Sequence, residues 1–544
     1  MAAPIYPTYP PNLSPAQLDY LLANVKDWSI LHGLAVRPAQ AFVAEEIDPS
    51  RSLAVTAPVT LFPSLFPKAC FEEAREIQTA YNELYALIAG DEKWLQEIVE
   101  DLMEVDDFIA NLWNIHLSVK KEGYAQVPFP LITPLHRVDT DHGLKSLSLG
   151  IFRSDYMVHN NPSDVVTNAQ IRQVEFNTIA SSFGGLAAKV SDLHKHLLKI
   201  SAYPTTASNV LTNDSLPSNP SIVSISKGLA TAHVAYGPSR HSPPLPLCVL
   251  FIVQDPENNA FDQHALATPL LDHHHVLSFR LPFADVLSFT STPKNHSSRP
   301  LVYAPPQSPE TAYEVTMVYF RAGYSPNEYS TSFAWDARLH LERSAAIKCP
   351  SILTHLAGSK KVQQVLATPS SPHLSRFLSS NPQSARYIQR IQATFAAIYP
   401  LDNTDAGKYA ISIAKDACKS KGYVLKPQRE GGGNNVYGVK IPQFLEKLGN
   451  DEKKYRGHIL MELIEPPALQ NTVFRNGQVT TGEVIGELGI YGVCLWSNSN
   501  ANEQPKIMEN WEAGFLLRTK GRESEEGGVA AGFGAVDSVC LVDA

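Results

Sequence analysis

The chain has 544 residues, of which 44% are hydrophobic and 18% are charged, and these are values typical of a globular protein. The formal net charge of −9 excludes a general nucleic-acid-binding surface, because no basic excess is present to neutralise phosphates. A chain of this length is expected to form about two to four domains.

The cysteine pattern and the absence of targeting signals indicate the compartment. The six cysteines are scattered, and no two have the spacing of a CxxC metal or redox motif, so free thiols in a reducing compartment are expected. The N-terminal residues lack the basic and apolar regions of a secretory signal, and no apolar run reaches the roughly 18 residues that a membrane span needs. The sequence therefore predicts a soluble cytoplasmic protein with no membrane partner and no nucleic-acid partner.

Helical patterns fill the first part of the chain. Ser14 can cap a helix whose first position is Pro15, and apolar residues then recur at helical spacing up to Val25. A second helical region covers 68–121, with Phe71, Trp94, Leu95, Ile98, Leu102, Phe108 and Trp113 as expected core positions. Its acidic residues are interpreted as a solvated face of a scaffold.

Strand patterns begin after Gly143. Residues 146–152 and 173–177 alternate between apolar and polar side chains, and residues 183–198 read as a helix. Residues 203–221 and 237–247 are rich in Ser and Pro, so surface loops or disordered segments are expected there.

Two fully apolar runs follow, at 247–253 and 317–320, and they are typical of buried strands in an α/β domain. Together with a helix expected between 261 and 271, they predict a substrate-binding α/β domain at 222–359. The last third combines a helical stretch at 360–400 with strands at 459–464 and 487–490. A second Gly-rich loop follows Arg518 and Lys520.

The most distinctive motif is KPQREGGGNNVYG, from Lys426 to Gly438, which follows a predicted strand at 423–425. Glycines allow close approach of the backbone to a ligand, and a row of free N–H groups can cradle anionic oxygens. Lys426 supplies a positive charge for phosphate, and Glu430 supplies an oxygen of the kind that Mg²⁺ prefers. The alternative is a flexible linker. The motif is neither a Walker A sequence nor GxGxxG, so we interpret it as part of a different type of nucleotide-triphosphate site.

A metal site is suggested by two residues on a strand. Glu175 and Asn177 are two positions apart, so their side chains share a face, although a solvated strand face would look the same. With Glu430 they could hold Mg²⁺ against triphosphate oxygens.

Three arginines follow or end predicted strands. Arg153, Arg321 and Arg518 suggest a substrate with several carboxylates, and Tyr324 lies beside the second of them. Each arginine taken alone is more often part of a surface salt bridge. No GxSxG, HExxH or Cys/His nucleophile pattern is present, so covalent hydrolase and zinc enzyme readings have little support.

Taken together, these segments resemble eukaryotic glutathione synthetase, a family of the ATP-grasp superfamily. The matching segments follow the order of the family over most of the chain. They are RSDYM (153–157), QVEFNTIASSFGGLA (173–187), FDQ (261–263), VYFRAGYSP (318–326), WDARLHLERSAAIKCPSI (335–352), LAGSKKVQQ (356–364), KPQREGGGNNVYG (426–438), ILMELIEPP (459–467), GELGIYGV (486–493) and LLRTK…GGVAAG (516–532).

The resemblance implies an α/β fold of mixed α+β character, namely an ATP-grasp fold with an inserted parallel-sheet substrate domain and a Gly-rich lid. The implied domains are a helical and ATP-grasp part at 1–221, a substrate-binding domain at 222–359, and a C-terminal ATP-grasp part at 360–544 with its lid at about 400–482. The implied reaction joins γ-glutamylcysteine to glycine with ATP through an acyl phosphate, with Mg²⁺ as cofactor. A homodimer is also implied.

The resemblance also implies roles for particular residues. Arg153 and Arg518 would be catalytic, and the metal ligands would be Glu175, Asn177 and Glu430. The expected ATP contacts are Glu175, Lys360, Lys426, Glu430, Gly431, Gly432, Gly433, Asn434, Asn435, Tyr437, Met461, Glu462, Leu463, Ile464, Glu487, Lys520 and Glu526. The expected substrate contacts are Arg153, Ser182, Glu257, Asn258, Asn259, Gln263, Arg321, Tyr324, Arg518, Val529 and Ala530.

Two positions depart from the family pattern. Ala180 replaces the first of two serines in the substrate loop, which puts one side-chain contact in doubt, and Glu526 stands where Asp is common. Two alternatives to glutathione synthesis stay open. One is a related ligase that uses another amine such as β-alanine, and the other is a non-catalytic ATP-binding protein of the same fold.

Overall fold

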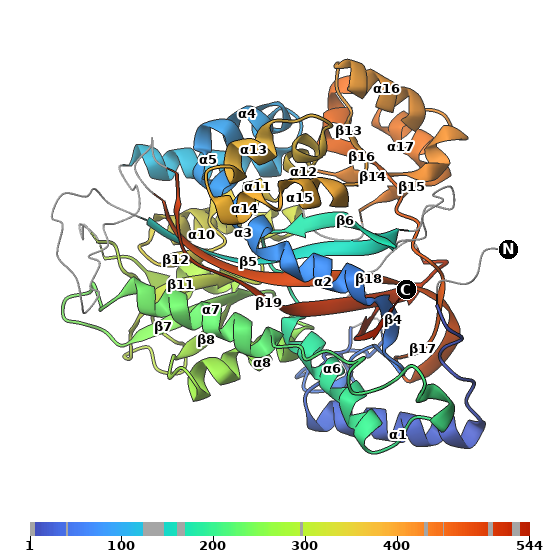
Figure 1. The fold of residues 1–544 in the computed structure, drawn as a ribbon. Coiled ribbons are helices and arrows are strands. Elements are labelled where there is room, and N and C mark those ends of the chain that lie inside the picture. Colours follow the sequence, from blue (N-terminus) through green and yellow to red (C-terminus); the bar gives the residue numbers. More distant parts are fainter. Residues whose placement is uncertain are drawn as a thin grey trace.

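A single large β-sheet runs through the molecule (Figure 1). The computed structural model describes residues 6–39, 42–122, 146–159, 169–293, 298–428, 434–449, 451–498, 504–524 and 534–543. Among these residues the large sheet has 13 strands. They are β3 (Val59–Thr60), β5 (Ser146–His159), β6 (Gln170–Asn177), β7 (Leu247–Val253), β8 (Ser278–Pro282), β9 (Thr290–Ser291), β10 (Leu301–Tyr303), β11 (Tyr313–Phe320), β12 (Ile347–Cys349), β17 (Leu469–Arg475), β18 (Gln478–Asn498), β19 (Lys506–Gly521) and β20 (Gly534–Asp537).

The centre of this sheet is antiparallel, and one end is largely parallel. β6 pairs with β5, β5 with β18, and β18 with β19, all antiparallel. Beyond β5 the sheet continues through β12, β11, β7 and β8, whose pairings are parallel. The predicted parallel strands at 247–253 and 317–320 are therefore confirmed, and they extend the same sheet as β5 and β18. The domain boundaries at 221 and 359 stay a prediction.

Alternate side chains of the central strands enter two hydrophobic cores, one on each face of the sheet. On β5, Phe152 and Tyr156 belong to one core, whereas Leu149 and Ile151 belong to the other. Helices cover both cores because each layer must bury its apolar face. The first core is covered by α2 (Lys68–Glu76), α3 (Gln78–Gly90), α4 (Glu92–Met103), α5 (Asp107–Lys121), α9 (Val286–Phe289), α10 (Ser332–Arg343), α11 (Ile352–Ala357), α12 (Lys360–Ala367), α13 (His373–Leu378), α14 (Pro382–Ala385) and α15 (Ile388–Thr394). The second is covered by α1 (Pro15–Leu31), α6 (Gly184–Lys199), α7 (Ser221–Tyr236) and α8 (Ala260–Asp272).

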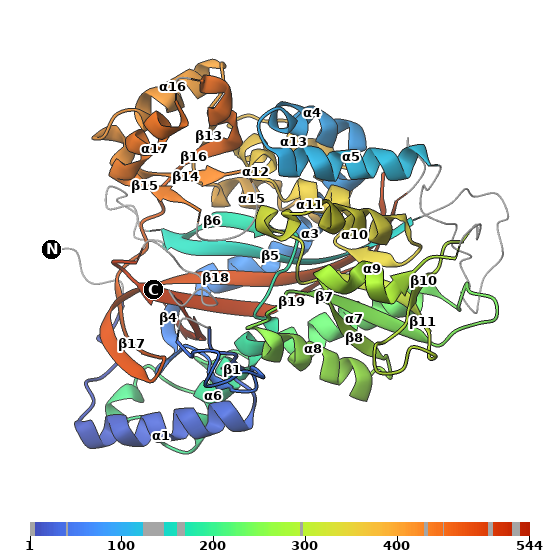
Figure 2. The ribbon, with the colours of Figure 1, turned by 180° about the vertical axis from the view of Figure 1, so that it is seen from behind.

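A second, smaller sheet stands apart from the parallel strands of the large sheet. It has the order β13 (Ile398–Pro400), β16 (His458–Glu462), β14 (Tyr423–Pro427) and β15 (Val436–Tyr437), and α16 (Asp405–Ala414) and α17 (Ile441–Leu448) cover it. Figures 1 and 2 both show it at the opposite end of the molecule from β7, β8 and β11. Two short pairs complete the described strands, β1 (Ala35–Val36) with β2 (Val55–Thr56) and β4 (Ser64–Pro67) with β21 (Val539–Val542).

Most of the local predictions are confirmed. Ser14 caps α1 through a capping box with Gln17, and the region 68–121 consists of four helices, α2 to α5. The expectation of a loop or disordered segment at 203–221 is only half right. The segment is a loop, but Tyr203, Leu211 and Leu216 are buried in the second core, which holds the loop in place.

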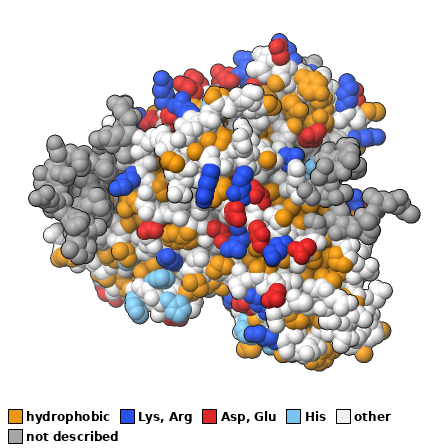
Figure 3. Space-filling view, viewed as in Figure 1, with side chains coloured by type: hydrophobic (Ala, Val, Ile, Leu, Met, Phe, Trp, Pro, Cys, Tyr) orange, Lys and Arg blue, Asp and Glu red, His pale blue; other side chains and the backbone are white. Residues whose placement is uncertain are grey.

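The surface between the helices carries many charges of both signs. Figure 3 shows them side by side across the middle of one face, where α2 runs in Figure 1. Ion pairs there join Arg75 to Glu512 and Arg390 to Glu73. No helix among the described residues is long and apolar enough to cross a membrane.

One glycine controls how closely α3 approaches the sheet. A Cβ atom at Gly492 on β18 would lie 1.9 Å from Oδ1 of Asn82, which is buried on α3. That Oδ1 accepts a hydrogen bond of 2.9 Å from Gln78, and Asn82 Nδ2 donates one of 2.9 Å to Asn510.

We therefore expect Gly492→Ala to lower the free energy of unfolding by about 1–3 kcal/mol, because the added methyl group overpacks this contact. Urea denaturation followed by circular dichroism would measure the change. Gly482→Ala on the same strand is the matched control, since no atom lies within 4 Å of its Cβ position. Equal stability of the two variants would contradict the close packing of α3.

Candidate active site

A cavity of about 320 Å³ opens between the large sheet and the small sheet. Its walls come from β5, β6, β18 and β19 on one side and from β14, β15 and β16 on the other. The residues that line it are Arg153, Met157, Val174, Glu175, Asn177, Ile179, Ala180, Ser182, Tyr324, Lys360, Val424, Lys426, Pro427, Asn435, Tyr437, Met461, Glu462, Leu463, Ile464, Ile485, Glu487, Arg518 and Lys520. Most predicted ATP contacts and four predicted substrate contacts therefore meet around one space.

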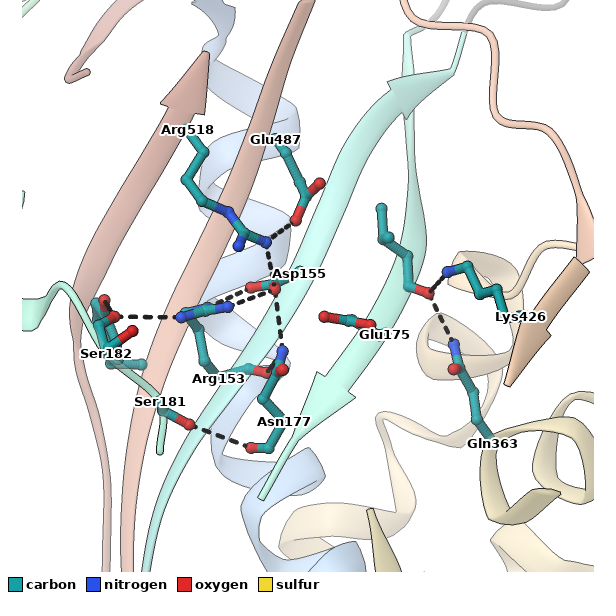
Figure 4. A network of polar contacts seen from close by, with 12 residues as sticks. Arg153, Asp155, Glu175, Asn177, Ser181, Ser182, Gln363, Lys426, Glu487 and Arg518 are labelled. Atoms are coloured by element: carbon teal, nitrogen blue, oxygen red, sulfur yellow. Dashed lines mark hydrogen bonds and ion pairs between the residues drawn. The ribbon is translucent and has the colours of Figure 1, made fainter. Parts of the chain in front are cut away.

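A buried carboxylate lies at the centre of the polar network beside this cavity (Figure 4). Oδ2 of Asp155 accepts hydrogen bonds from Arg153 Nη2 at 2.8 Å, from Asn177 Nδ2 at 2.9 Å and from Arg518 Nη2 at 2.9 Å. Oδ1 accepts a further bond of 2.6 Å from Arg153 Nε. The same Arg518 nitrogen also pairs with Glu487. Asp155 thus joins the two predicted catalytic arginines to a predicted metal ligand.

The strand register brings these residues together. Arg153 lies opposite Asn177 in the pairing of β5 with β6, and Glu487 lies opposite Arg518 in the pairing of β18 with β19. Side chains at paired positions stand on the same face of a sheet. This is the face that also carries the second hydrophobic core, and the polar side chains begin where that core ends.

The two described metal candidates both line the cavity, but they are held differently. Glu175 Oε2 forms an ion pair of 2.9 Å with Lys360 Nζ, whereas Asn177 donates to Asp155 and to the carbonyl oxygen of Arg153. Burial would raise the pKa of the Glu175 carboxyl, but the positive charges of Lys360 and Lys426 outweigh it and hold that pKa well below its usual range. Glu175 is therefore ionised, as a cation ligand must be. The third candidate, Glu430, lies outside the described residues.

Lys426 is a buried cation next to this carboxylate. Its Nζ donates a hydrogen bond of 2.9 Å to the carbonyl oxygen of Val174. Burial lowers the pKa of Lys426 to about 8, and Lys360 adds to this decrease while Glu175 opposes it. A buried amine with this pKa responds strongly to any anion that enters the cavity.

The rest of the cavity wall divides into an apolar part and a polar loop. Val424, Met461, Leu463, Ile464 and Ile485 form the apolar part. Asn435 lies in the polar loop and donates from Nδ2 to the hydroxyl of Tyr437 at 3.3 Å. Its neighbour Asn434 is exposed and is not among the lining residues. Gly431, Gly432 and Gly433 lie outside the described residues, as do Glu526, Val529 and Ala530.

The segment before α6 presents backbone groups to the cavity. The carbonyl oxygen of Ser182 accepts hydrogen bonds from Arg153 Nη1 at 3.2 Å and from the hydroxyl of Tyr491 at 2.6 Å. Ala180 and Phe183 have φ values of 49° and 72°, in the left-handed region. Ala180, which departs from the family pattern, still lines the cavity.

One further predicted substrate residue, Glu257, lines a second cavity of about 280 Å³. Gln254 and Arg280 line the same cavity. Gln263 links two of these residues, because its Nε2 donates to Glu257 Oε2 at 2.6 Å and its Oε1 accepts from Arg280 Nε at 2.8 Å. Gln254 also donates to the hydroxyl of Tyr324, which lines the first cavity, at 3.1 Å. The two cavities are therefore neighbours.

Three predicted substrate contacts are occupied by internal bonds. Arg321 pairs with the buried carboxylate of Asp262 at 2.8 Å, and Asn259 Nδ2 lies 3.4 Å from the same carboxylate. Asn258 accepts a hydrogen bond from Arg51 instead. Arg321 itself is buried and lines neither cavity.

The sequence reasoning missed Asp155, Asp262 and Arg280. Asp155 carried a signal, because it lies two residues after Arg153 on a strand and so shares its face. Asp262 lies inside the FDQ motif, but only the fold shows that it accepts from Arg321 and from the backbone of Phe183 and Gly185.

The chain matches known proteins along almost its whole length. Residues 15–541 match the family model for the eukaryotic glutathione synthase, ATP binding domain. The glutathione synthetase large chain of Schizosaccharomyces pombe is 37% identical over 540 residues, which cover 97% of this chain and 98% of the relative. The glutathione synthetase of Homo sapiens is 37% identical over 525 residues, which cover 96% of each chain.

A solved structure supports the fold. The glutathione synthetase-like effector GSS30 from Globodera pallida, in its apo form, superposes with a TM-score of 0.68 over 98% of both chains at 19% identity. At this identity the likeness concerns the fold alone, and it agrees with the predicted ATP-grasp architecture of mixed α/β character. The chain therefore belongs to the eukaryotic glutathione synthase family and is an ATP-dependent ligase of that family.

Proposed function

We propose that this protein is a glutathione synthetase, which joins the cysteinyl carboxylate of γ-glutamylcysteine to the amine of glycine at the expense of ATP. The observation that supports this most directly is the set of cations around one cavity. Arg153, Arg518, Lys360 and Lys426 all line it, together with the ionised Glu175. Such a set suits a triphosphate and a carboxylate that must approach each other despite their like charges.

The reaction would run in two steps. A carboxylate oxygen of the dipeptide attacks the γ-phosphorus of ATP, the bond to the β,γ-bridging oxygen breaks, and ADP leaves. The glycine nitrogen then attacks the acyl carbon, and phosphate leaves with the proton that the amine loses. Lys360 and Lys426 would hold the phosphates, while Arg518 would stabilise the negative charge that develops on the transferred group.

Mg²⁺ is the cofactor that the donor set suits. Glu175 offers a carboxylate, and Asn177 offers the carbonyl oxygen of an amide whose nitrogen is already used by Asp155. Glu430 would be the third ligand in this proposal. An ion held by these residues would offset the negative charge of the phosphate groups.

The substrates would divide between the two cavities. The nucleotide and the reacting carboxylate would occupy the first, beside Ser182 and Tyr324, and the glutamyl end of the dipeptide would reach the second, beside Glu257, Gln263 and Arg321. Val529 and Ala530 would contact glycine, and the segment at about 400–482 with its Gly-rich loop would act as a lid.

The protein is proposed to be cytoplasmic and homodimeric. All six cysteines are free thiols, and five of them are buried, which suits a reducing compartment. The homodimer is carried over from the family resemblance.

The first test is ADP release by the purified protein. We expect release that requires γ-glutamylcysteine, Mg²⁺ and an amine, with glycine as the best amine in a panel that includes β-alanine. A coupled pyruvate kinase assay measures it. A preference for β-alanine would mean that β-alanine, and not glycine, is the amine substrate. Binding of ATP without any ADP release would instead identify a non-catalytic protein of the same fold.

The second test concerns Arg518. We expect Arg518→Ala to lower kcat by about 10²–10³-fold, because a charge donor at the transferred group is lost. The matched control is Arg522→Ala, which removes an exposed arginine just after the same strand. Among the described residues, its side chain forms an ion pair with Glu483 at 3.4 Å. A similar kcat in both variants would remove Arg518 from the catalytic role.

The third test uses the low pKa of Lys426. Phosphate oxygens should raise this pKa from about 8, so nucleotide binding at about pH 8.5 should take up protons, and affinity should fall as the pH rises further. Calorimetry in two buffers with different ionisation enthalpies measures the uptake. Lys426→Met should abolish it, whereas Lys447→Met, which alters an exposed residue of α17, should not. Equal proton uptake in both variants would contradict the assignment.

A further inference from the structure

Asp155 lies at the centre of the hydrogen-bond network beside the first cavity, yet none of the roles proposed above belongs to it. Its carboxylate is fully buried, and it receives four hydrogen bonds from three residues on three different strands. Arg153 comes from β5, Asn177 from β6 and Arg518 from β19. A substrate would meet these three partners, whereas Asp155 lies behind them and is not among the residues that line the cavity.

The first consequence is the orientation of the Asn177 amide. Its Nδ2 faces two acceptors, Asp155 Oδ2 at 2.9 Å and the carbonyl oxygen of Arg153 at 3.3 Å. A flipped amide would place its oxygen against both acceptors and would lose both hydrogen bonds. Asp155 therefore determines which end of the amide remains for a cation, and that end is the oxygen.

The second consequence is the position of the two guanidinium groups. Arg153 and Arg518 donate to the same oxygen of Asp155, at 2.8 and 2.9 Å. Two like charges this close repel each other strongly when water is excluded, so a shared counter-charge is needed to keep them together. Glu487 forms a direct ion pair with Arg518, whereas Asp155 accepts hydrogen bonds from both guanidinium groups.

The third observation is a glycine that leaves room for this arrangement. Asp155 on β5 and Arg518 on β19 are separated by β18, where Gly489 lies opposite Asp155. A Cβ atom at Gly489 would lie 2.7 Å from Asp155 Oδ1 and 2.7 Å from Arg153 Cδ. The missing side chain on β18 therefore leaves room for the ion pair between Arg153 and Asp155.

We propose that Asp155 is a positioning residue for the reaction, which directs the Asn177 carbonyl oxygen toward the magnesium site and holds the guanidinium groups of Arg153 and Arg518 side by side. This inference rests on the proposed function, because the residues that Asp155 would position, Asn177, Arg153 and Arg518, have their proposed roles in that reaction. The rival explanation is that Asp155 is only a buried ion-pair partner that stabilises the fold.

The test is calorimetric binding of ADP with Mg²⁺ and without it, in EDTA. We expect Asp155→Asn to weaken binding of ADP with Mg²⁺ by about 10–100-fold, the usual effect of losing a residue that orients a metal ligand. Binding of metal-free ADP should stay within about threefold, because Asp155 does not line the nucleotide cavity. An unchanged ratio of the two affinities would overturn the proposal.

A double variant in which the two residues are exchanged provides a second test if Asp155→Asn does not fold. The double variant Asp155→Asn/Asn177→Asp keeps one amide and one carboxylate in the same hydrogen-bonded pair and still offers an oxygen to the cation. We expect it to recover at least part of the magnesium dependence of ADP binding. A folded double variant with no magnesium dependence would also overturn the proposal.

A second buried carboxylate serves as the matched control. Glu314 is also fully buried and accepts hydrogen bonds from Tyr236, Ser239 and Arg240, but it lines neither cavity. Glu314→Gln should lower the melting temperature and leave the ratio of the two ADP affinities unchanged. Failure of the proposed function would be visible in the unmodified protein, as absent ADP release with dipeptide and glycine, so the two failures are distinguishable.

Discussion

The site depends on the alternation of side chains along neighbouring strands. Residues two apart on a strand share a face, and antiparallel partners at paired positions share it too. Because β5, β6, β18 and β19 lie next to one another, this rule alone places Arg153, Asp155, Asn177, Glu487 and Arg518 on one face. A shift of one residue in any of these pairings would move the polar side chains of that strand to the opposite face of the sheet, where they would enter the other hydrophobic core.

Burial strengthens the interactions between these charged side chains and makes the side chains depend on one another. In a site that excludes water, an unpaired charge is costly, so each cation here has an anion close by. Glu175 pairs with Lys360, and Arg518 lies between Asp155 and Glu487. The pKa values of Glu175 and Lys426 are both lowered, but for different reasons, since the carboxylate is surrounded by cations whereas the amine is mainly desolvated. An incoming triphosphate would therefore compete with these carboxylates for the same cations.

Local sequence patterns predicted the elements well and their assembly poorly. The cap at Ser14, the apolar strand at 247–253 and the strand at 173–177 are all confirmed, because each depends on neighbours in the chain. The fold also brings together residues that were assigned to the site by family resemblance. Lys360 and Lys426, for example, line the same cavity. Asp155 was missed because its importance comes from partners on β6 and β19, more than twenty positions away from it in the chain. The burial of Tyr203 in a Ser-rich loop was missed for the same reason.

The division of the walls between two sheets has a consequence for specificity. The large sheet supplies Arg153, Asn177 and Arg518, whose positions are fixed by long strands and by one shared carboxylate. The small sheet supplies Lys426 and the apolar wall that includes Met461, and it has its own separate core. Under the proposed function, groups that must be placed precisely relative to one another would stand on the large sheet, whereas the part of the wall that would admit and release a nucleotide would stand on the small sheet. A change of amine would therefore require few changes in the large sheet, because the groups that hold the reacting carboxylate would stay in place.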